Sequence, residues 1–276
     1  MNRGASGTAS ETAGNTTELR TSSLVIESVV FAGRLFTRWR RDPMVPVQSL
    51  LFPTIMLVIY HVLLSKSMAK VMGTDNIVLV VAMCALAGAM SGTLASALAI
   101  PVERTNGLLS RFWVMPVHRV SALSGTLLAE VVRTVVGTLL IVTVGIAFGL
   151  RFHGGPPALI LFTLLPVLWI VVFAMVVITV AVHSTNRTML TWFASAVMGM
   201  VFGNSSVVPM KALPTWVRPI IEFQPMSPTI ATMRGLSQGG PVLTPLLLTA
   251  TWLVLLAAVF LPLAIRGYRS ASEAGG

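Results

Sequence analysis

The sequence has 276 residues, of which 55% are hydrophobic and only 10% are charged, and its mean hydropathy is +0.85. Soluble proteins carry about 25% charged residues, so this composition excludes a soluble protein and predicts an integral membrane protein. The net charge of +10 is explained by Lys and Arg residues that set membrane topology and face anionic lipid, so nucleic acid is not an expected partner. The length allows about six spans of roughly 20 residues and no separate soluble domain.

The chain begins with a polar stretch. Residues 1–22 are rich in Ser, Thr, Gly and Ala and contain no apolar block, which predicts a disordered cytoplasmic tail. Residues 23–41 combine apolar positions at helical spacing with clustered arginines, which predicts an interfacial helix that ends at Asp42-Pro43. The arginines of this predicted helix are Arg34, Arg38, Arg40 and Arg41. The alternative is that they only form a cationic flank that anchors the first span.

Six apolar stretches follow, and they predict an all-α polytopic fold. The predicted spans are about 44–65, 76–100, 128–150, 158–183, 188–208 and 242–265. Pro46 and Pro53 would kink the first span, which membrane helices tolerate because neighbouring groups bond to the freed carbonyls. Gly88 and Gly92 lie four residues apart in the second span, a spacing that allows two helix backbones to approach closely.

A short, charged and amphipathic segment, residues 101–119, separates the second and third apolar stretches. It lacks groups arranged for covalent chemistry. A cationic surface between two spans typically binds a lipid headgroup or a protein partner, so we interpret this segment as a docking site.

The third apolar stretch is longer than a membrane requires. Residues 120–150 would form a helix of about 46 Å, compared with a hydrocarbon core of roughly 30 Å. If the outer end lies near Gly149, Glu130 and Arg133 lie at the inner membrane interface. Three residues apart on one helix, they share a face and are expected to form a structural ion pair, although ionisable residues inside a membrane are also functional candidates.

Residues 209–240 are too many for a simple turn and too apolar for a solvated loop. We expect two short helices on or dipping into the outer leaflet, at about 214–223 and 228–236, the second ended by Gly239-Gly240. The residues that mark this external turn or re-entrant segment are Pro209, Pro214, Trp216, Pro225 and Arg234.

Most of the 19 Lys and Arg residues fall on one side when the six spans are threaded with both termini in the cytoplasm. The positive-inside rule therefore predicts a multi-pass protein of the cell (plasma) membrane with cytoplasmic termini, including a tail at 270–276.

A search for chemical motifs finds no catalytic set, no P-loop and no metal site: the only aspartates are Asp42 and Asp75, and the only cysteine is Cys84. No cofactor is therefore expected in this chain. An intramembrane serine protease would need Ser and His on facing helices, and this alternative stays open for Ser91, Ser205 or Ser206 with His61 or His183. An ion-coupled secondary transporter, the other alternative, would need ionisable residues in mid-span.

Three blocks of the sequence carry a family resemblance. They are the segment 103–119, the turn 149–155 (Gly-Leu-Arg-Phe-His-Gly-Gly) and the run 209–234, which contains Leu213-Pro214-Thr215-Trp216. In this order they resemble the cytoplasmic motif, the external turn and the segment before the sixth span of ABC-2 type exporter permeases. The similarity extends from about Val25 to Arg269 and favours the daunorubicin-resistance branch, although Thr105-Asn106 and Leu213 depart from the usual pattern.

The resemblance implies a transport subunit and not an enzyme. In such exporters two six-span permeases, identical or sibling, work with two separate P-loop ATPase subunits that bind ATP and Mg. The residues implied to contact the ATPase are Glu103, Arg104, Gly107, Leu108, Arg111, Phe112, Trp113 and Pro116. The implied cargo is hydrophobic or amphipathic: a drug, or a complex lipid such as the phthiocerol dimycocerosate associated with a mycobacterial permease of this branch.

Overall fold

The computed structural model describes residues 33, 37, 40, 44–64, 77–105, 119–183, 187–204 and 213–273. Within these ranges every regular element is helical, so the all-α prediction is confirmed. The elements are α2 (Met44–Ile59), the π-helical turn η1 (Tyr60–Leu64), α4 (Ile77–Thr105), α6 (Arg119–Ala147), α7 (Gly155–His183), α8 (Arg187–Phe202), α9 (Arg218–Phe223), α10 (Met226–Gln238) and α11 (Leu243–Glu273).

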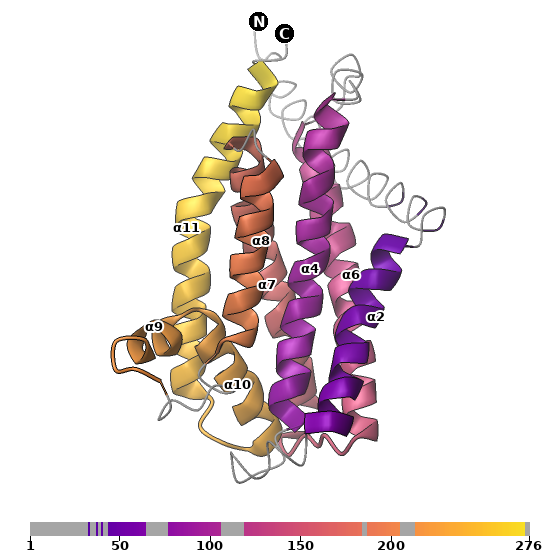
Figure 1. Cartoon of the computed structure of the whole chain (residues 1–276), viewed down its shortest axis with the longest axis vertical. Helices are drawn as coiled ribbons and strands as arrows, with labels where there is room; N and C mark the ends of the chain where they lie inside the picture. Colours follow the sequence, from indigo (N-terminus) through magenta and orange to yellow (C-terminus); the bar gives the residue numbers. More distant parts are fainter. Residues whose placement is uncertain are drawn as a thin grey trace, which may run out of the picture.

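The long helices lie side by side along the long axis of the molecule (Figure 1). Among the described residues, four stretches are long and apolar enough to cross a membrane: Ile77–Leu94, Gly125–Ala147, Gly155–Val180 and Leu243–Ala264. The predicted first and fifth spans correspond to the shorter apolar stretches Leu50–Leu63 and Thr191–Phe202. The chain is therefore a multi-pass membrane protein, and the number of six crossings stays a prediction.

Helix α4 is at the centre of the bundle. In its apolar stretch Ile77–Leu94, 89% of the residues are buried, whereas only 6% are buried in the stretch Leu243–Ala264 of α11. The reason is that α4 packs against α2, α6, α7, α8 and α10. Short side chains allow neighbouring helices to approach this closely, and those buried along α4 are Ala82, Ala85, Ala87, Gly88, Ala89 and Gly92.

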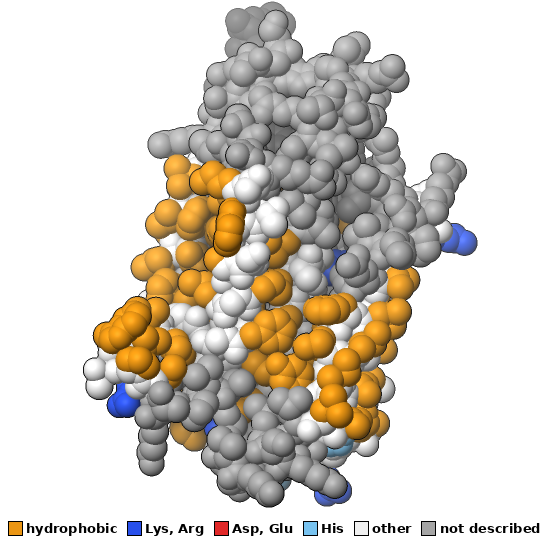
Figure 2. Space-filling model, in the orientation of Figure 1, with side chains coloured by type: hydrophobic (Ala, Val, Ile, Leu, Met, Phe, Trp, Pro, Cys, Tyr) orange, Lys and Arg blue, Asp and Glu red, His pale blue; other side chains and the backbone are white. Residues whose placement is uncertain are grey.

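The outer surface of the bundle is apolar. Figure 2 shows hydrophobic side chains over α2, α9 and α11 on the face in view. Exposed examples are Phe52 on α2 and Val254 on α11, which are 53% and 68% exposed. An apolar surface of this extent requires a covering of lipid or protein.

The two helices expected before the last span are present, with shifted boundaries. Residues 214–217 form a turn closed by a bond from Val217 N to Pro214 O (3.0 Å), and α9 follows it. Helix α10 starts at Met226, two residues before Pro228. A proline is tolerated in the first helical turn because the backbone N–H groups there have no partner within the helix. It ends as predicted at Gly239, whose positive φ of 74° forms a left-handed cap on Gly235 O.

Helices α9 and α10 gather at the end of the bundle opposite the C-terminal end of α11 (Figure 1). Helix α10 is inserted between α4, α7 and α11. Its Thr229 accepts a hydrogen bond from Trp169 Nε1 (2.9 Å), and Thr232 lies 3.5 Å from Thr249 of α11. In contrast, α9 exposes Ile220 and Phe223.

Candidate functional site

The segment predicted to dock a partner connects two helices that pack against each other. Residues 101–105 form the last turns of α4, and Arg119 begins α6. Glu103 and Arg104 therefore lie on helical backbone, while the other implied contact residues, Gly107, Leu108, Arg111, Phe112, Trp113 and Pro116, lie outside the described residues. The C-terminal ends of α4 and α11 lie at the same end of the bundle (Figure 1).

The interfacial helix predicted at 23–41 is described at three positions. Gly33, Thr37 and Arg40 are helical and exposed, and the Thr37 hydroxyl donates to Gly33 O at 2.9 Å. Arg34, Arg38 and Arg41 lie outside the described residues. The helix as a whole stays a prediction.

Glu130 and Arg133 form the ion pair that their spacing on α6 predicts. Both are buried, with 2% and 5% of their surface exposed. Arg133 Nε and Nη2 donate to the same carboxylate oxygen, Glu130 Oε2, at 3.0 and 2.5 Å. The Thr93 hydroxyl of α4 donates to this oxygen at 3.2 Å. The placement of the pair at the inner membrane interface stays a prediction.

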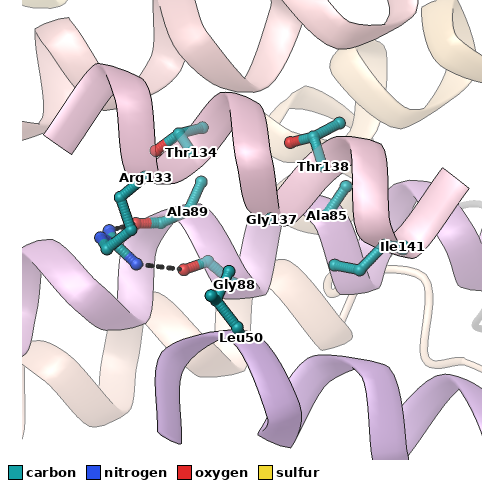
Figure 3. Close-up of a pocket in the computed structure, with 9 residues that line it drawn as sticks. All are labelled: Leu50, Ala85, Gly88, Ala89, Arg133, Thr134, Gly137, Thr138 and Ile141. Carbon is teal, nitrogen blue, oxygen red and sulfur yellow. Dashed lines mark hydrogen bonds between the residues drawn. The ribbon is translucent and has the colours of Figure 1, made fainter. Parts of the chain in front are cut away.

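The Arg133 guanidinium also reaches across to the backbone of α4. Nη1 donates to Gly88 O at 3.3 Å and Nη2 to Ala89 O at 3.0 Å (Figure 3). Each helical carbonyl already accepts one bond within its helix and has a second lone pair to offer. Both helices therefore contribute to a hydrogen-bonded cluster made of Thr93, Glu130 and Arg133 with these two carbonyls, which we call the α4–α6 cluster.

Gly92 makes room for this arrangement. A Cβ atom built on Gly92 would overlap the guanidinium carbon and both terminal nitrogens of Arg133. The sequence pattern of Gly88 and Gly92 predicted close approach of two backbones. Helices α4 and α6 do pack against each other, and the space that Gly92 leaves is filled by the Arg133 side chain.

The energetics favour keeping both members of the pair. Taking two charges out of water is unfavourable, and the loss is compensated only when the geometry is good and the remaining donors find partners. Removing one member alone leaves an uncompensated buried charge, which typically costs about 3–5 kcal/mol. The cluster therefore strongly orients α4 and α6 relative to each other.

A small cavity adjoins the cluster (Figure 3). Its volume is about 10 Å³, close to the minimum for a single water molecule and far below the roughly 300–1,000 Å³ of a ligand pocket. The lining residues come from α2, α4 and α6: Leu50, Ala85, Gly88, Ala89, Arg133, Thr134, Gly137, Thr138 and Ile141. The buried hydroxyls of Thr134 and Thr138 have no hydrogen-bond partner among the described residues.

At the opposite end, the turn between α6 and α7 is attached to α10. His153 donates from its backbone N (3.0 Å) and its ring Nδ1 (2.9 Å) to Ser237 O, and the Ser237 hydroxyl donates to Arg151 O at 2.6 Å. We call this attachment the α10 clasp, and the sequence did not predict it. The Gly and Pro residues around it predicted a turn, but nothing in the sequence pairs that turn with α10.

The marked residues of the segment before α11 have different surroundings. Pro214 and Trp216 are exposed, and Pro225 is the N-cap of α10. Arg234 is exposed and donates from Nε to Gln238 Oε1 at 2.9 Å. Pro209 lies outside the described residues.

The described side chains do not assemble a catalytic or metal site. No group of three or more His, Cys, Asp or Glu residues in the described ranges is placed to hold a metal ion. Of the serines and histidines of the protease alternative, Ser91 donates to Gly88 O at 3.1 Å, and the His61 ring stacks on Phe148 with a centroid distance of 4.3 Å. Ser205 and Ser206 lie outside the described residues.

Comparison with known proteins identifies the family. Residues 28–236 match the family model described as ABC-2 type transporter. The chain is 33% identical over 249 residues to the probable doxorubicin resistance ABC transporter permease protein DrrC of Mycobacterium tuberculosis, with 90% of each chain covered. It is 29% identical over 171 residues to the daunorubicin resistance ABC transporter permease protein DrrB1 of Streptomyces coeruleorubidus, covering 59% of this chain and 58% of that one.

A more distant relative is the putative transport permease ycf38 of Cyanophora paradoxa, which is 22% identical over 217 residues, or 76% of this chain and 73% of the relative. The relatives are named as permeases, which agrees with the absence of a P-loop from the sequence. The chain belongs to the ABC-2 type transporter family, as a permease of the drug-resistance type and not an ATPase.

Proposed function

We propose that this chain forms the membrane path of an ABC exporter that moves a hydrophobic or amphipathic substrate out of the cell. Separate ATPase subunits would bind ATP and Mg and act on the segment 101–119 from the cytoplasm. The observation that carries the proposal is the 33% identity, over 90% of both chains, to a permease named for doxorubicin resistance. The substrate would be a drug of that class or a complex lipid such as phthiocerol dimycocerosate.

The lengths of three helices support docking at the end of the bundle that carries the segment 101–119. Helix α4 continues past its apolar stretch through residues 95–105, which at 1.5 Å per residue is roughly 16 Å. Helix α11 continues through residues 265–273, roughly 14 Å, and α6 begins at Arg119, roughly 9 Å before its apolar stretch. Helices that leave the hydrocarbon region together provide a rigid surface for a soluble partner. This end would be cytoplasmic, with both chain termini on that side of the cell membrane.

The surface of α2 and α8 supports a substrate path shared with a second permease, identical or sibling. Both helices pack on the buried helix α4 and expose large apolar side chains. Phe52 on α2 and Trp192 on α8 are 53% and 72% exposed. A path between two permeases lined by such residues would open sideways to lipid and suits a bulky apolar cargo.

The test is ATP-driven transport by a reconstituted complex. The chain would be co-purified with a candidate P-loop ATPase subunit, placed in proteoliposomes, and assayed for movement of doxorubicin and of a fluorescent long-chain lipid. Glu103→Lys is expected to abolish transport while the chain still inserts in the membrane, because the charge at the docking surface is reversed. Glu222→Lys on exposed α9, at the opposite end, is the matched control and should transport normally. Equal transport by both variants would contradict docking at 101–119.

A further inference from the structure

The α4–α6 cluster joins the two helices on either side of the proposed docking segment. On α4, Thr93 lies roughly 18 Å along the helix from its end at Thr105. On α6, Arg133 lies roughly 21 Å from the start of the helix at Arg119. The cluster therefore connects the two helices at a similar depth below the docking segment. A displacement of the docking segment would act on the end of α4 and the start of α6, and the cluster joins these two helices deeper in the bundle.

The contacts of Arg133 fix the position of α6 along α4. The guanidinium is a rigid planar fork, and its donors are fixed both on Glu130 of its own helix and on two carbonyls of α4. Sliding one helix past the other by a full turn, about 5.4 Å, would break the bonds to Gly88 O and Ala89 O. The cluster is buried and the adjoining cavity has room for about one water molecule, so water would replace the lost bonds only in part.

Each apolar contact around the cluster is individually weak and non-directional, whereas the bonds of Arg133 require a particular register of the two helices. Gly92 adds a second constraint. Because Gly92 has no side chain, the Arg133 guanidinium lies directly against the backbone of α4, which it also contacts through hydrogen bonds.

We propose that Arg133, Glu130, Thr93 and Gly92 lock α4 to α6, so that a push on the docking segment moves both helices as one unit. The proposal rests on the proposed function for the source of the push. Arg133 and Glu130 are then positioning residues for transport: they contact neither the ATPase nor the substrate, and they determine how far motion at the docking end reaches into the membrane.

The first test measures export per ATP hydrolysed. The double variant Glu130→Leu/Arg133→Met removes both charges at similar volume, a change that buried pairs generally tolerate. We expect the variant to fold and to bind the ATPase subunits. The variant complex should hydrolyse ATP at a rate within about twofold of the parent complex, while export per ATP falls at least tenfold. Arg133→Lys keeps the charge without the fork and should recover only part of the ratio. The control is Thr143→Val on the exposed face of α6, which should leave the ratio unchanged.

The second test needs neither ATPase nor substrate, so it separates this proposal from the proposed function. Cys84 is the only cysteine, and a Cys84→Ala background therefore allows spin labels at residues 105 and 119 alone, with labelled chains diluted among unlabelled ones. We expect one narrow distance distribution in the parent and a distribution at least twice as broad in the Glu130→Leu/Arg133→Met variant.

An unchanged distribution in the double variant would overturn the lock. A broadened distribution with an unchanged export ratio would show that the cluster holds the helices without transmitting motion, which would overturn its role in transport. If the parent chain shows no ATP-driven export, the proposed function fails, and the label distances still decide whether the cluster locks α4 to α6.

Discussion

Gly92→Ala is predicted to destabilise the fold severely for so small a change. The added methyl would occupy the position of the Arg133 guanidinium. The Arg133 side chain would then have to move away and lose its bonds to Gly88 O and Ala89 O. Hydrogen bonds to charged groups contribute about 1.5–3 kcal/mol each, and the higher helix propensity of Ala offsets about 1 kcal/mol. The expected net loss is therefore about 2–5 kcal/mol in the free energy of unfolding.

The assay is reversible unfolding of the purified chain in mixed dodecyl maltoside and SDS micelles, followed by tryptophan fluorescence. Gly199→Ala on α8 is the matched control, because a Cβ there meets no atom within 4 Å. It should leave stability unchanged or raise it by up to about 1 kcal/mol. The triple variant Gly92→Ala/Glu130→Leu/Arg133→Met should recover most of the lost free energy of unfolding, because no guanidinium then occupies the space beside residue 92. Equal stability of Gly92→Ala and Gly199→Ala would refute the reasoning.

Three further substitutions test other contacts by the same unfolding assay. Thr138→Val removes a buried hydroxyl that has no partner among the described residues, so stability should stay the same or rise; a loss above about 1 kcal/mol would mean that the hydroxyl is bound, for instance to water in the adjoining cavity. Ser237→Ala removes the hydroxyl that holds Arg151 O in the α10 clasp and should cost about 0.5–1.5 kcal/mol, with ATP hydrolysis by the complex unaffected; no loss would show that the clasp is held by the His153 contacts alone. Trp169→Phe deletes the donor to Thr229 and should cost at least about 1 kcal/mol, and a neutral result would count against the seating of α10 in the bundle.

Hydropathy located the membrane helices well and their ends less well. The fourth predicted span, 158–183, is close to α7 at Gly155–His183. By contrast, α11 continues to Glu273, past the predicted 265, whereas α6 begins at Arg119, next to residue 120 where its helix was expected. The reason is physical: hydropathy reports where a helix contacts lipid, whereas the helical hydrogen-bond ladder continues into the polar regions on either side.

The fifth predicted span was too long for a different reason. Residues 188–208 read as one apolar run, but α8 ends at Phe202. There the buried Asn204 side chain donates to Val201 O, and Gln224 donates to Gly203 O, which caps the helix from a distant part of the chain. Such a cap depends on tertiary structure and has no local sequence signal.

In the candidate site, the contact within one helix could be predicted from the sequence, whereas the contacts between helices could not. The three-residue spacing of Glu130 and Arg133 was sufficient to predict their pairing, because residues at this spacing share a helix face. The contribution of Gly88, Ala89, Gly92 and Thr93 required knowledge of which helix packs against that face. Small residues in a span predict close packing without specifying whether a backbone or a side chain fills the space.

The most direct test of the central claim is ATP-dependent transport by purified components. Proteoliposomes containing this chain alone, the ATPase subunits alone, or both would be given ATP and Mg, and doxorubicin and the fluorescent lipid would be followed across the membrane. The account predicts transport of at least one of them only when both components are present. Transport or ATP hydrolysis by this chain alone, or transport driven by an ion gradient without the ATPase, would contradict it.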